Sequence, residues 1–570
     1  MPSGSQLAET PHSRLDRALA DLSAAKESWA RLPLARKIDY ARVLRDGVQR
    51  VAAGGVDAAL EAKGIDPRSP RAGEEWIGGP YVTSRVLRLL IDSLDRLRRR
   101  GGLQIPPSRL RVRGDKRLAV EVFPHDVYDR ALYAGFRAEV WMQPGVDRSN
   151  LGDHVASFYR RPHPAGGVAL VLGAGNVASI GPLDVIHKLF VEGRVAILKL
   201  NPVNDYLGPF IEDAFGELIH DGYVRVAYGG AEVGSYLVNH PAVDEIHITG
   251  GAATHDAIVY GPGPEGARRR AAGEPLLAKR ITSELGNVSP VILVPGRWSN
   301  AELEFHAESL ATQMVQNGGF NCNAVRVILT HRDWPQRDAF LDHLRRVLAS
   351  LPPRRAYYPG AAERRERFLA AYPDAEEIGP AGEDLDLQPV LATGLDPDSC
   401  EPLAFREEAF CAFSAEATLA ANGAEDFLRR AVDFANERLY GTLNASVVCR
   451  PSTRKRLGPS FDRAVADLRY GTVGVNQWPA LGYGIGSTPW GAFPGHTLDD
   501  IQSGIGTVHN TFLFDRPEKT VIDAPFTVWP RPPWFVTHRG GARLAERLTR
   551  FEAHPGPVEL ARVLLAAVGG

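Results

Sequence analysis

One cysteine and one glutamate, 38 residues apart, have neighbours suited to covalent catalysis. A thiolate attacks a carbonyl carbon far better than a thiol does, and glycines beside it let the substrate and the backbone approach closely. Cys322 follows Gly318 and Gly319 and fits this description. Glu284 precedes the largely apolar run 288–294, where a carboxylate can be set aside to activate water. A lone cysteine is more often a small buried hydrophobe, and a lone glutamate is more often a solvated acid. The hypothesis of a nucleophile and a base therefore depends on the two occurring together.

The two segments resemble motifs of the aldehyde dehydrogenase superfamily. The general-base motif of that family reads roughly Glu-Leu-Gly-Gly-Lys-Ser-Pro, and residues 284–290 read Glu-Leu-Gly-Asn-Val-Ser-Pro. Its cysteine motif reads roughly Gly-Gln-x-Cys-x-Ala, and residues 319–324 read Gly-Phe-Asn-Cys-Asn-Ala. Asn287, Val288 and Phe320 depart from these patterns. None of the three removes a reacting group, but each could reshape the pocket.

The resemblance covers roughly residues 130–505 and implies an α/β fold with a Rossmann-type cofactor domain, an α/β catalytic domain and a small oligomerisation region. A chain of 570 residues is too long for one core, which also predicts two or three domains. We assign residues 1–285 to a helical lead-in and the cofactor-binding domain, with an oligomerisation strand near 150–165. Residues 286–505 form the predicted catalytic domain, and residues 506–570 a C-terminal oligomerisation strand or extension of unknown role.

Two local predictions follow from the same resemblance. Residues 132–139 resemble the helix that precedes the cofactor fold in relatives, and residues 156–161 resemble the strand that contributes to oligomer contacts. The periodic aliphatic residues of the first 130 positions predict helices.

The turn at 173–178 matches Gly-x-Gly-x-x-Ala after an apolar strand. In a Rossmann fold such a turn binds a pyrophosphate, and an acid about 20 residues later binds the ribose. Here the next strand ends at Lys199 without an acid. The resemblance implies instead that Asn176 donates to the developing oxyanion, which is worth about 3 kcal/mol of barrier. It also implies that Lys199 binds the adenosine ribose or a 2′-phosphate. Because no glutamate stands three residues after Lys199, both NAD and NADP remain open.

Further cofactor contacts are implied at two glycine turns and at a Glu-Glu-x-Phe segment. Glycine turns that open a helix offer N–H donors to an anion. The expected residues are Gly230 and Gly234 in the first turn, Thr249 and Gly250 in the second, and Glu408 and Phe410 beside the nicotinamide riboside. The aromatic residues Trp478, Trp490 and Phe320 are expected at the mouth of the pocket.

Composition excludes several classes of partner. Lys plus Arg number 66 and Asp plus Glu number 68, so neither nucleic acid nor an anionic membrane is expected as the main partner. Four cysteines without a Cys-x-x-Cys pair argue against a disulfide framework or structural zinc, and no metal site is expected. No targeting segment or run of about 18 apolar residues is found, which predicts a cytoplasmic protein.

The predicted reaction is the oxidation of a small-molecule aldehyde to a carboxylic acid with NAD or NADP, through a thiohemiacetal and a thioester on Cys322. Glu284 would then activate water. A CoA-acylating dehydrogenase or acyl-CoA reductase remains open, because Asn287 and Val288 replace the usual Gly-Lys. A catalytically inactive cofactor-binding scaffold also remains open. The resemblance implies a homo-oligomer, a dimer or a tetramer, and does not indicate which aldehyde is used.

Overall fold

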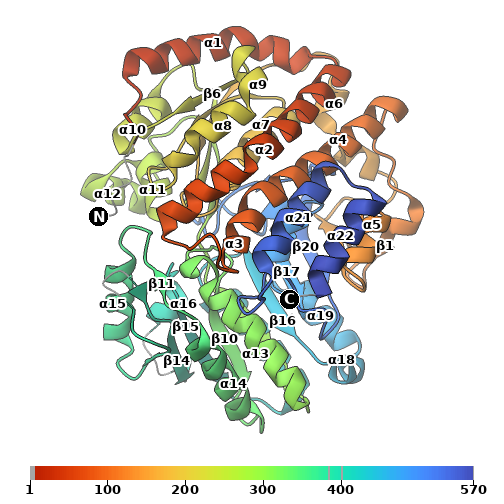
Figure 1. The fold of residues 1–570 in the computed structure, drawn as a ribbon, viewed down its shortest axis with the longest axis vertical. Coiled ribbons are helices and arrows are strands. Elements are labelled where there is room, and N and C mark those ends of the chain that lie inside the picture. The colour runs from red at the N-terminus through yellow and green to blue at the C-terminus, as the bar shows by residue number, and fades with distance from the viewer. Residues whose placement is uncertain (1–6, 383–385, 399–401, 569–570) are drawn as a thin grey trace.

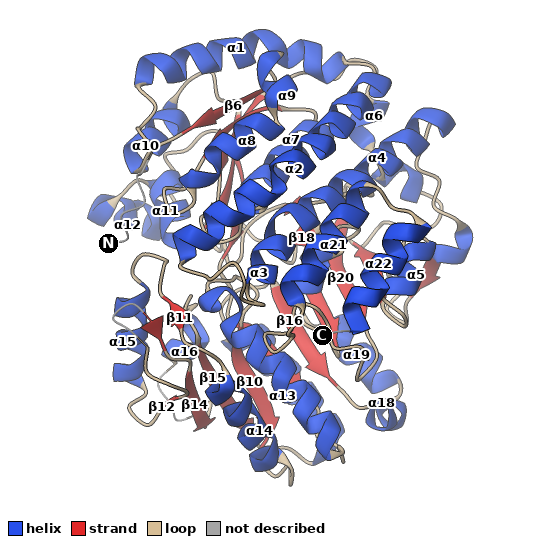
Figure 2. Cartoon of the chain, viewed as in Figure 1, coloured by secondary structure: helices blue, strands red, loops and turns tan. Residues whose placement is uncertain are grey.

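The structure is a computed structural model that describes residues 7–382, 386–398 and 402–568 of the chain (Figure 1). Cys400, one of the four cysteines, lies outside these ranges. Two large sheets form the centre of the molecule, and helices cover them (Figure 2). The prediction of an α/β fold with a Rossmann-type sheet is confirmed.

The smaller sheet has five parallel strands in the order β6-β5-β4-β7-β8. Its central strands β4 and β5 are nearly continuous apolar runs, as expected of parallel strands that are buried on both faces. The strand order reverses between β4 and β7, and ligands usually bind α/β sheets outside the carboxyl ends of strands at such a point. The strands are β4 (Val168–Leu172), β5 (Val195–Lys199), β6 (Val224–Ala227), β7 (Glu245–Gly250) and β8 (Arg280–Leu285).

The larger sheet has eleven strands in the order β1-β2-β3-β20-β17-β16-β9-β10-β15-β14-β12, parallel from β20 to β14 and antiparallel at both edges. Successive residues of a strand face opposite sides, so Ile292 and Val327 belong to one core cluster and Val291 and Ile328 to another. The strands are β1 (Leu110–Val112), β2 (Leu118–Phe123), β3 (Arg137–Met142), β9 (Ser289–Leu293), β10 (Val325–His331), β12 (Glu376–Glu377), β14 (Val390–Leu395), β15 (Phe413–Leu419), β16 (Asn444–Val448), β17 (Thr472–Val475) and β20 (Pro517–Asp523).

The N-terminal helices pack over the smaller sheet, where Trp29 donates its indole N–H to the Leu189 carbonyl at 3.0 Å. The helices of residues 1–285 are α1 (His12–Arg31), α2 (Leu34–Lys63), α3 (Ala72–Trp76), the π-helical turn η1 (Ile77–Tyr81), α4 (Val82–Arg100), α5 (Val127–Leu132), α6 (Ser157–Arg160), α7 (Ile180–Phe190), α8 (Gly208–Ala214), α9 (Gly216–His220), α10 (Ala231–Asn239), α11 (Ala252–Tyr260) and α12 (Gly263–Ala272).

The later helices include those that cover the larger sheet, with α13 and α14 on one face and α17 and α19 on the other. They are α13 (Asn300–Val315), α14 (Arg337–Ser350), α15 (Ala361–Ala371), α16 (Leu403–Arg406), α17 (Gly423–Arg438), α18 (Pro451–Leu457), α19 (Pro459–Asp467), α20 (Ala480–Gly484), α21 (Gly541–Ala553) and α22 (Pro557–Val568). Short elements complete the fold: η2 (Pro107–Arg109), η3 (Leu151–His154), η4 (Asp205–Leu207), η5 (Gln316–Gly319), β11 (Arg354–Arg355), β13 (Asp386–Leu387), β18 (Trp490–Gly491) and β19 (Thr507–Val508). None of the helices in the described ranges combines the length and the apolar character that a membrane crossing requires.

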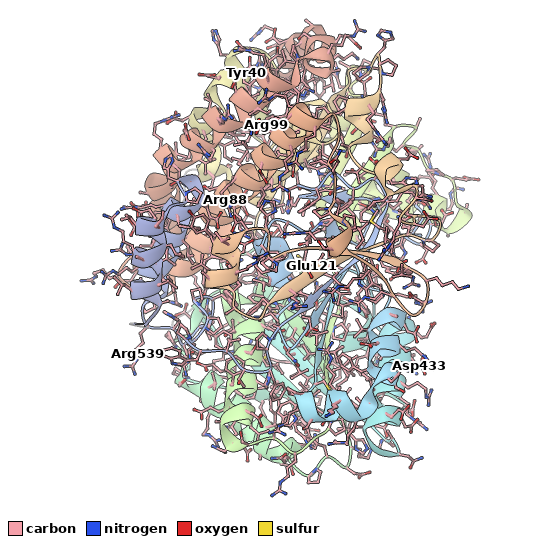
Figure 3. The ribbon with its side chains drawn as sticks, turned by 90° about the vertical axis from the view of Figure 1, so that its right-hand side faces the viewer. Tyr40, Arg88, Arg99, Glu121, Asp433 and Arg539 are labelled. Carbon is pink, nitrogen blue, oxygen red and sulfur yellow. The ribbon has the colours of Figure 1, made fainter. Side chains whose placement is uncertain are left out.

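The C-terminal segment is fixed to the N-terminal helices by buried ion pairs. Glu552 of α21 accepts from Arg85 Nη1 at 2.7 Å and from Arg88 Nε at 2.7 Å, and both arginines belong to α4 (Figure 3 labels Arg88). Arg85 also pairs with Asp129 at 2.8 Å. The side chains of Arg85, Asp129 and Glu552 are all buried. An arginine that is buried between two carboxylates holds them in one geometry, so α21 is held in place against α4.

Two sequence predictions of local structure need correction. Residues 132–139 do not form a helix, because α5 ends at Leu132, Gly135 adopts a positive φ of 83°, and β3 begins at Arg137. Residues 156–161 do not form a strand; Ser157–Arg160 is the helix α6, and within 150–165 only Val155 makes an isolated bridge, to Phe514. The sheets change between Leu285 and Ser289, at the predicted boundary, yet β1, β2 and β3 lie in the larger sheet together with β20. The division into domains and the oligomerisation role of 150–165 and 506–570 stay predictions.

Candidate active site

The candidate nucleophile lies on a tight loop between α13 and β10. After α13 the chain turns through Asn317, Gly318 and Gly319, whose φ angles are 54°, 68° and 78°. A Cβ on Gly319 would lie 2.6 Å from the backbone nitrogen of Ala412, so only glycine lets the loop pass this close to the neighbouring chain. The loop delivers Cys322, which is only partly buried, to the end of the sheet.

Glu284 contacts this cysteine directly. It is the fifth residue of β8, and its carboxylate Oε1 accepts from Cys322 Sγ at 3.4 Å. Burial is the main reason why the pKa of Glu284 rises from its ordinary value to about 7. Burial and the nearby charges of Glu284 and Glu408 raise the pKa of Cys322 well above its ordinary value. The resting cysteine is therefore a thiol hydrogen-bonded to the Glu284 carboxyl group, and not the free thiolate that the sequence suggested. When it is deprotonated, Glu284 is placed to take the thiol proton.

Asn176 lines the same pocket as Cys322 and Glu284. It lies in the turn after β4, and its amide nitrogen donates to the Phe320 carbonyl at 2.9 Å, two residues before Cys322. A primary amide carries two N–H groups, and the described residues engage only one of them. The three residues that the sequence singled out as reacting groups thus converge on one pocket between the two sheets.

A buried lysine, which the sequence gave no reason to select, connects the two loops. Lys63 Nζ, at the end of α2, donates to Glu75 Oε1 at 2.7 Å, to Asn317 Oδ1 at 3.0 Å and to the Asn176 carbonyl at 3.3 Å. Burial is the largest single influence and opposes its charge, but Glu75 together with Tyr206 and Glu74 outweighs burial, so the pKa of Lys63 is raised. Asn317 Nδ2 also donates to the Asn176 carbonyl at 3.0 Å. This Lys63 network sets the position of the Asn176 turn relative to the cysteine loop.

The departures from the family motifs have structural explanations. Asn287 is fully buried; its amide nitrogen donates to Ser289 Oγ at 3.0 Å and to the Asn444 carbonyl at 2.9 Å. Ser289 Oγ in turn donates to the Cys322 carbonyl at 3.3 Å. Val288 and Phe320 are buried in one apolar cluster of the larger sheet. The expectation that Phe320 lines the mouth is therefore wrong, because its ring packs into the core against Tyr357 and Tyr358.

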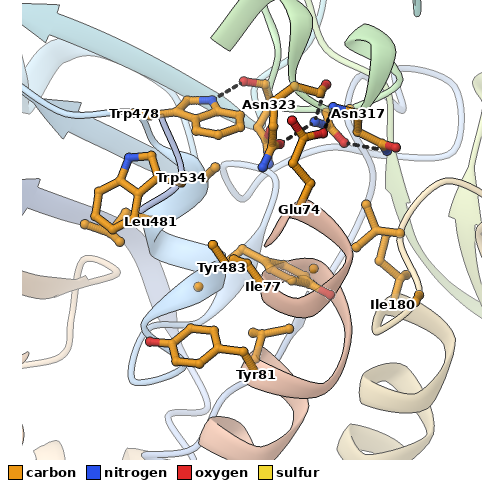
Figure 4. Close-up of a pocket in the computed structure, with 18 of the residues that line it drawn as sticks. Glu74, Ile77, Tyr81, Ile180, Asn317, Asn323, Trp478, Leu481, Tyr483 and Trp534 are labelled. Carbon is orange, nitrogen blue, oxygen red and sulfur yellow. Dashed lines mark hydrogen bonds between the residues drawn. The ribbon is translucent and has the colours of Figure 1, made fainter. Parts of the chain in front are cut away.

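The mouth of the pocket is largely apolar and is built from distant parts of the chain (Figure 4). Trp478 and Trp490 line the pocket, but Trp490 is buried beside Cys322, so its predicted place at the mouth stays a prediction. Trp478 donates its indole N–H to the Asn323 carbonyl at 2.7 Å. The other apolar lining residues include Ile77 and Tyr81 of η1, Ile180 of α7, Leu481 of α20, and Trp534 and Leu548 from the C-terminal segment. The segment after residue 505 thus forms part of the pocket wall, a role that the sequence did not reveal.

Glu408 has features expected of a ribose-binding acid. A Cβ on Gly286 would lie 2.1 Å from Glu408 Oε2, so the glycine after the β8 motif makes room for this carboxylate. Burial raises the pKa of Glu408 to about 7, although Arg326 lowers it in part. Its Oε1 is buried and has no hydrogen-bond partner among the described residues, so it can accept from a bound hydroxyl group. Phe410 lies two residues on with a φ of 44° and packs edge-on against Tyr358.

Lys199 and Gly230 lie at the carboxyl edge of the smaller sheet. Lys199 ends β5 and is 9% exposed, and no hydrogen bond or ion pair joins its ammonium to the part of the chain that the structure describes. Gly230 precedes α10, and its N–H is taken by Glu9 Oε1 at 2.9 Å. An unpaired cation beside a helix start suits an anionic or hydroxyl-bearing ligand, and in this respect both residues fit a dinucleotide.

The remaining predicted cofactor residues fit less well. The Thr249 hydroxyl donates to the buried carboxylate of Asp184 at 3.0 Å, so this side chain is engaged in the interior. Gly250 is exposed at the end of β7, and Gly234 lies in the first turn of α10 with open space beside its Cα. Their role at a cofactor stays a prediction. No group of three or more potential ligands that could hold a metal ion occurs within the described ranges.

Comparisons with known proteins agree with this geometry. Residues 131–359 match the profile of the Aldehyde dehydrogenase family. A 199-residue stretch is 27% identical to 4-trimethylaminobutyraldehyde dehydrogenase A of Danio rerio, covering 34% of this chain and 36% of that enzyme. The chain thus spans about a third of the length of the curated relatives it matches.

Two solved structures share the fold over almost the whole chain. The NADP complex of NADP-dependent glyceraldehyde-3-phosphate dehydrogenase from Bacillus halodurans superposes with a TM-score of 0.60 at 16% identity, covering 90% of this chain and 91% of that one. The NAD+ complex of a betaine aldehyde dehydrogenase double mutant from Staphylococcus aureus gives 0.61 at 15% identity, covering 92% of each chain. Residues 131–359 thus match the aldehyde dehydrogenase family, and almost the whole chain shares the fold of the superposed structures.

Proposed function

We propose that the protein oxidises an aldehyde to a carboxylic acid, with NAD or NADP as the electron acceptor. The observation that carries this proposal is the contact of 3.4 Å between Cys322 Sγ and Glu284 Oε1, in a pocket that Asn176 also lines. The curated relative in Danio rerio is named as an aldehyde dehydrogenase, and the two superposed structures hold NADP and NAD+. Lys199, Gly230 and Glu408 are the residues that would hold the dinucleotide.

The chemistry begins with the thiol proton of Cys322. Glu284 accepts this proton as the sulfur attacks the carbonyl carbon of the aldehyde, which forms a thiohemiacetal. The Asn176 amide and the Cys322 backbone N–H donate to the oxyanion, whose charge develops only during the reaction. NAD(P)+, when bound, supplies the hydride acceptor. Cys322 then carries the acyl group as a thioester, and Glu284 returns its proton to solvent.

Hydrolysis uses the same carboxylate again. Deprotonated Glu284 takes a proton from water, and the resulting hydroxide attacks the thioester carbon, which releases the carboxylic acid and the Cys322 thiol. The pKa of about 7 suits both proton transfers near neutral pH, because neither protonation state is strongly favoured. The apolar mouth supports aldehydes with an uncharged, apolar body over those with charged groups.

Turnover without CoA is the expected result that separates hydrolysis from acyl transfer. The purified protein is assayed for reduced nicotinamide with short aliphatic, long-chain and aromatic aldehydes, with each cofactor, and with and without CoA. We expect an acid product and an unchanged rate when CoA is added, because Glu284 lies within reach of the thioester sulfur. A strict requirement for CoA, with an acyl-CoA product, would support the CoA-acylating alternative. Nucleotide binding without any turnover would support the inactive scaffold.

The Lys63→Met variant is expected to lose both stability and rate. Removing the ammonium leaves the buried Glu75 carboxylate unpaired, which costs roughly 3–5 kcal/mol. The double variant Lys63→Met with Glu75→Gln removes the stranded charge and should recover most of that stability. Because Asn317 and Asn176 lose a shared donor in both variants, kcat should stay reduced roughly tenfold while KM changes less. Thermal unfolding and steady-state kinetics measure the two effects; a double variant with normal kcat would show that Lys63 serves stability alone.

A further inference from the structure

A short N-terminal segment crosses the carboxyl edge of the smaller sheet, where strands β5 and β6 end. The Thr10 backbone N–H donates to the Tyr228 carbonyl at 3.0 Å, and the Tyr228 N–H donates to Thr10 Oγ1 at 2.9 Å. The Leu7 backbone N–H also donates to the Asp205 carboxylate. The bonds at Leu7 and Thr10 fix the backbone on either side of Glu9.

Glu9 is thereby placed in the same neighbourhood as Lys199 and Gly230. Its Oε1 accepts from the Gly230 N–H at 2.9 Å, at the start of the nine-residue helix α10. Its side chain is otherwise exposed. Glu9 and Asp205 are the two acids whose negative charges act on the Lys199 ammonium. Lys199 is more than nine-tenths buried and makes no hydrogen bond or ion pair within the described ranges. A ligand at this edge therefore meets one cation without a direct partner and the exposed, partly engaged carboxylate of Glu9, while Asp205 is buried.

In Rossmann-type sheets the acid that binds the ribose hydroxyl groups stands at or just after the end of the second strand. In this chain the second strand is β5, and it ends in Lys199, Leu200 and Asn201 without an acid. The structure brings a carboxylate to that strand end from a residue 190 positions earlier in the sequence. A carboxylate accepts hydrogen bonds from two neighbouring hydroxyl groups but repels a phosphate, because the two groups carry charges of the same sign.

We propose that Glu9 is the residue that makes the protein prefer NAD over NADP, by accepting from the adenosine ribose and repelling a 2′-phosphate. This inference rests on the proposed function, since it names the cofactor of that same site. It also explains why the residues next to Lys199 in the sequence do not by themselves indicate whether NAD or NADP is preferred. The segment Leu7 to Thr10 is then part of the cofactor site, although it lies far outside the matched residues 131–359.

Direct binding tests the proposal without reliance on turnover. NAD+ and NADP+ are each titrated by calorimetry into the full-length protein and into Glu9→Gln. The matched control is Glu232→Gln, which removes the same charge from an exposed acid in the first turn of α10. We expect the wild type and the control to bind NAD+ at least tenfold more tightly than NADP+. In Glu9→Gln that ratio should fall about tenfold, because NADP+ binds more tightly and NAD+ more weakly.

Two results would overturn the proposal. An unchanged ratio in Glu9→Gln would show that Glu9 has no part in selection. Equal tightening of both nucleotides would show that Glu9 merely competes for the Gly230 N–H. If the ratio shifts but the protein oxidises no aldehyde, Glu9 selects the nucleotide and the proposed function is refuted. If the protein oxidises aldehydes but the ratio does not shift, the proposed function stands and the role of Glu9 is refuted. Binding of neither nucleotide would refute both.

Discussion

Replacing Cys322 by alanine is expected to abolish aldehyde oxidation, with a loss of roughly four orders of magnitude or more in kcat. The Cys322 sulfur is the atom that contacts Glu284 in the pocket lined by Asn176. Without this sulfur, the acyl group has no atom to which it can be attached. Reduced-nicotinamide formation measures the rate. Nucleotide binding should persist, because Lys199, Gly230 and Glu408 are unchanged.

Cys449→Ala is the matched control for this variant. Cys449 is buried in the core of the larger sheet, and the pKa of its thiol is raised to about 12, mainly by burial. The control should keep most of its activity and lose some thermal stability from the small cavity. If Cys322→Ala kept near-normal turnover while remaining folded, the covalent mechanism would be wrong.

The Glu284→Gln variant is expected to complete one oxidation and then stall. Glutamine keeps the size of the side chain but cannot take a proton from water, so the thioester on Cys322 should persist. Steady-state turnover should fall roughly a hundredfold to ten-thousandfold. A burst of about one reduced nicotinamide per active site should remain. The burst should also be slower than in the wild type, since Glu284 accepts the thiol proton as well.

The rate of hydrolysis should depend on pH through the protonation of Glu284. Its pKa is raised to about 7, so the base is mostly protonated below that pH and mostly free above it. Hydrolysis by the wild type should therefore rise as pH increases through about 7 and then level off. The same raised pKa means that the folded protein holds this proton more tightly than the unfolded chain, so the Glu284 contribution to stability falls as pH rises from its ordinary pKa to about 7. A Glu284→Gln variant with the same pH profile as the wild type would contradict the assigned base.

Local motifs carried the prediction of the reacting groups. Glu284, Cys322 and Asn176 each lie in a short segment whose strand, turn and glycines determine its conformation, and the structure brings all three to one pocket. The errors occurred where tertiary contacts override local preference. Phe320 packs into the core against a cluster of aromatic rings. Gly135 packs so closely against Pro525 that an added Cβ would lie 2.7 Å from it, and the segment 132–139 turns here instead of forming the predicted helix.

Contacts between distant segments could not be predicted in the same way. Lys63 meets Asn317 across 254 positions, and Glu9 meets Gly230 across 221. Trp534 and Leu548 reach the pocket from the C-terminal segment, whose helix α21 is held in place by buried ion pairs to α4 and by apolar packing. A single sequence contains no signal for such pairs. The raised pKa of Cys322 was equally hidden, because it depends on burial and on two carboxylates from different strands and loops.

The most direct test of the central claim is a mass measurement on Glu284→Gln, quenched after one turnover with an aldehyde and its cofactor. Cys322 should carry an acyl group, seen as a gain equal to the mass of the aldehyde less two hydrogens on the peptide that contains this residue. An unmodified Cys322 after reduced nicotinamide has formed, or an acyl group on another residue, would contradict the assignment of Cys322 as the nucleophile and Glu284 as the base that releases the acid.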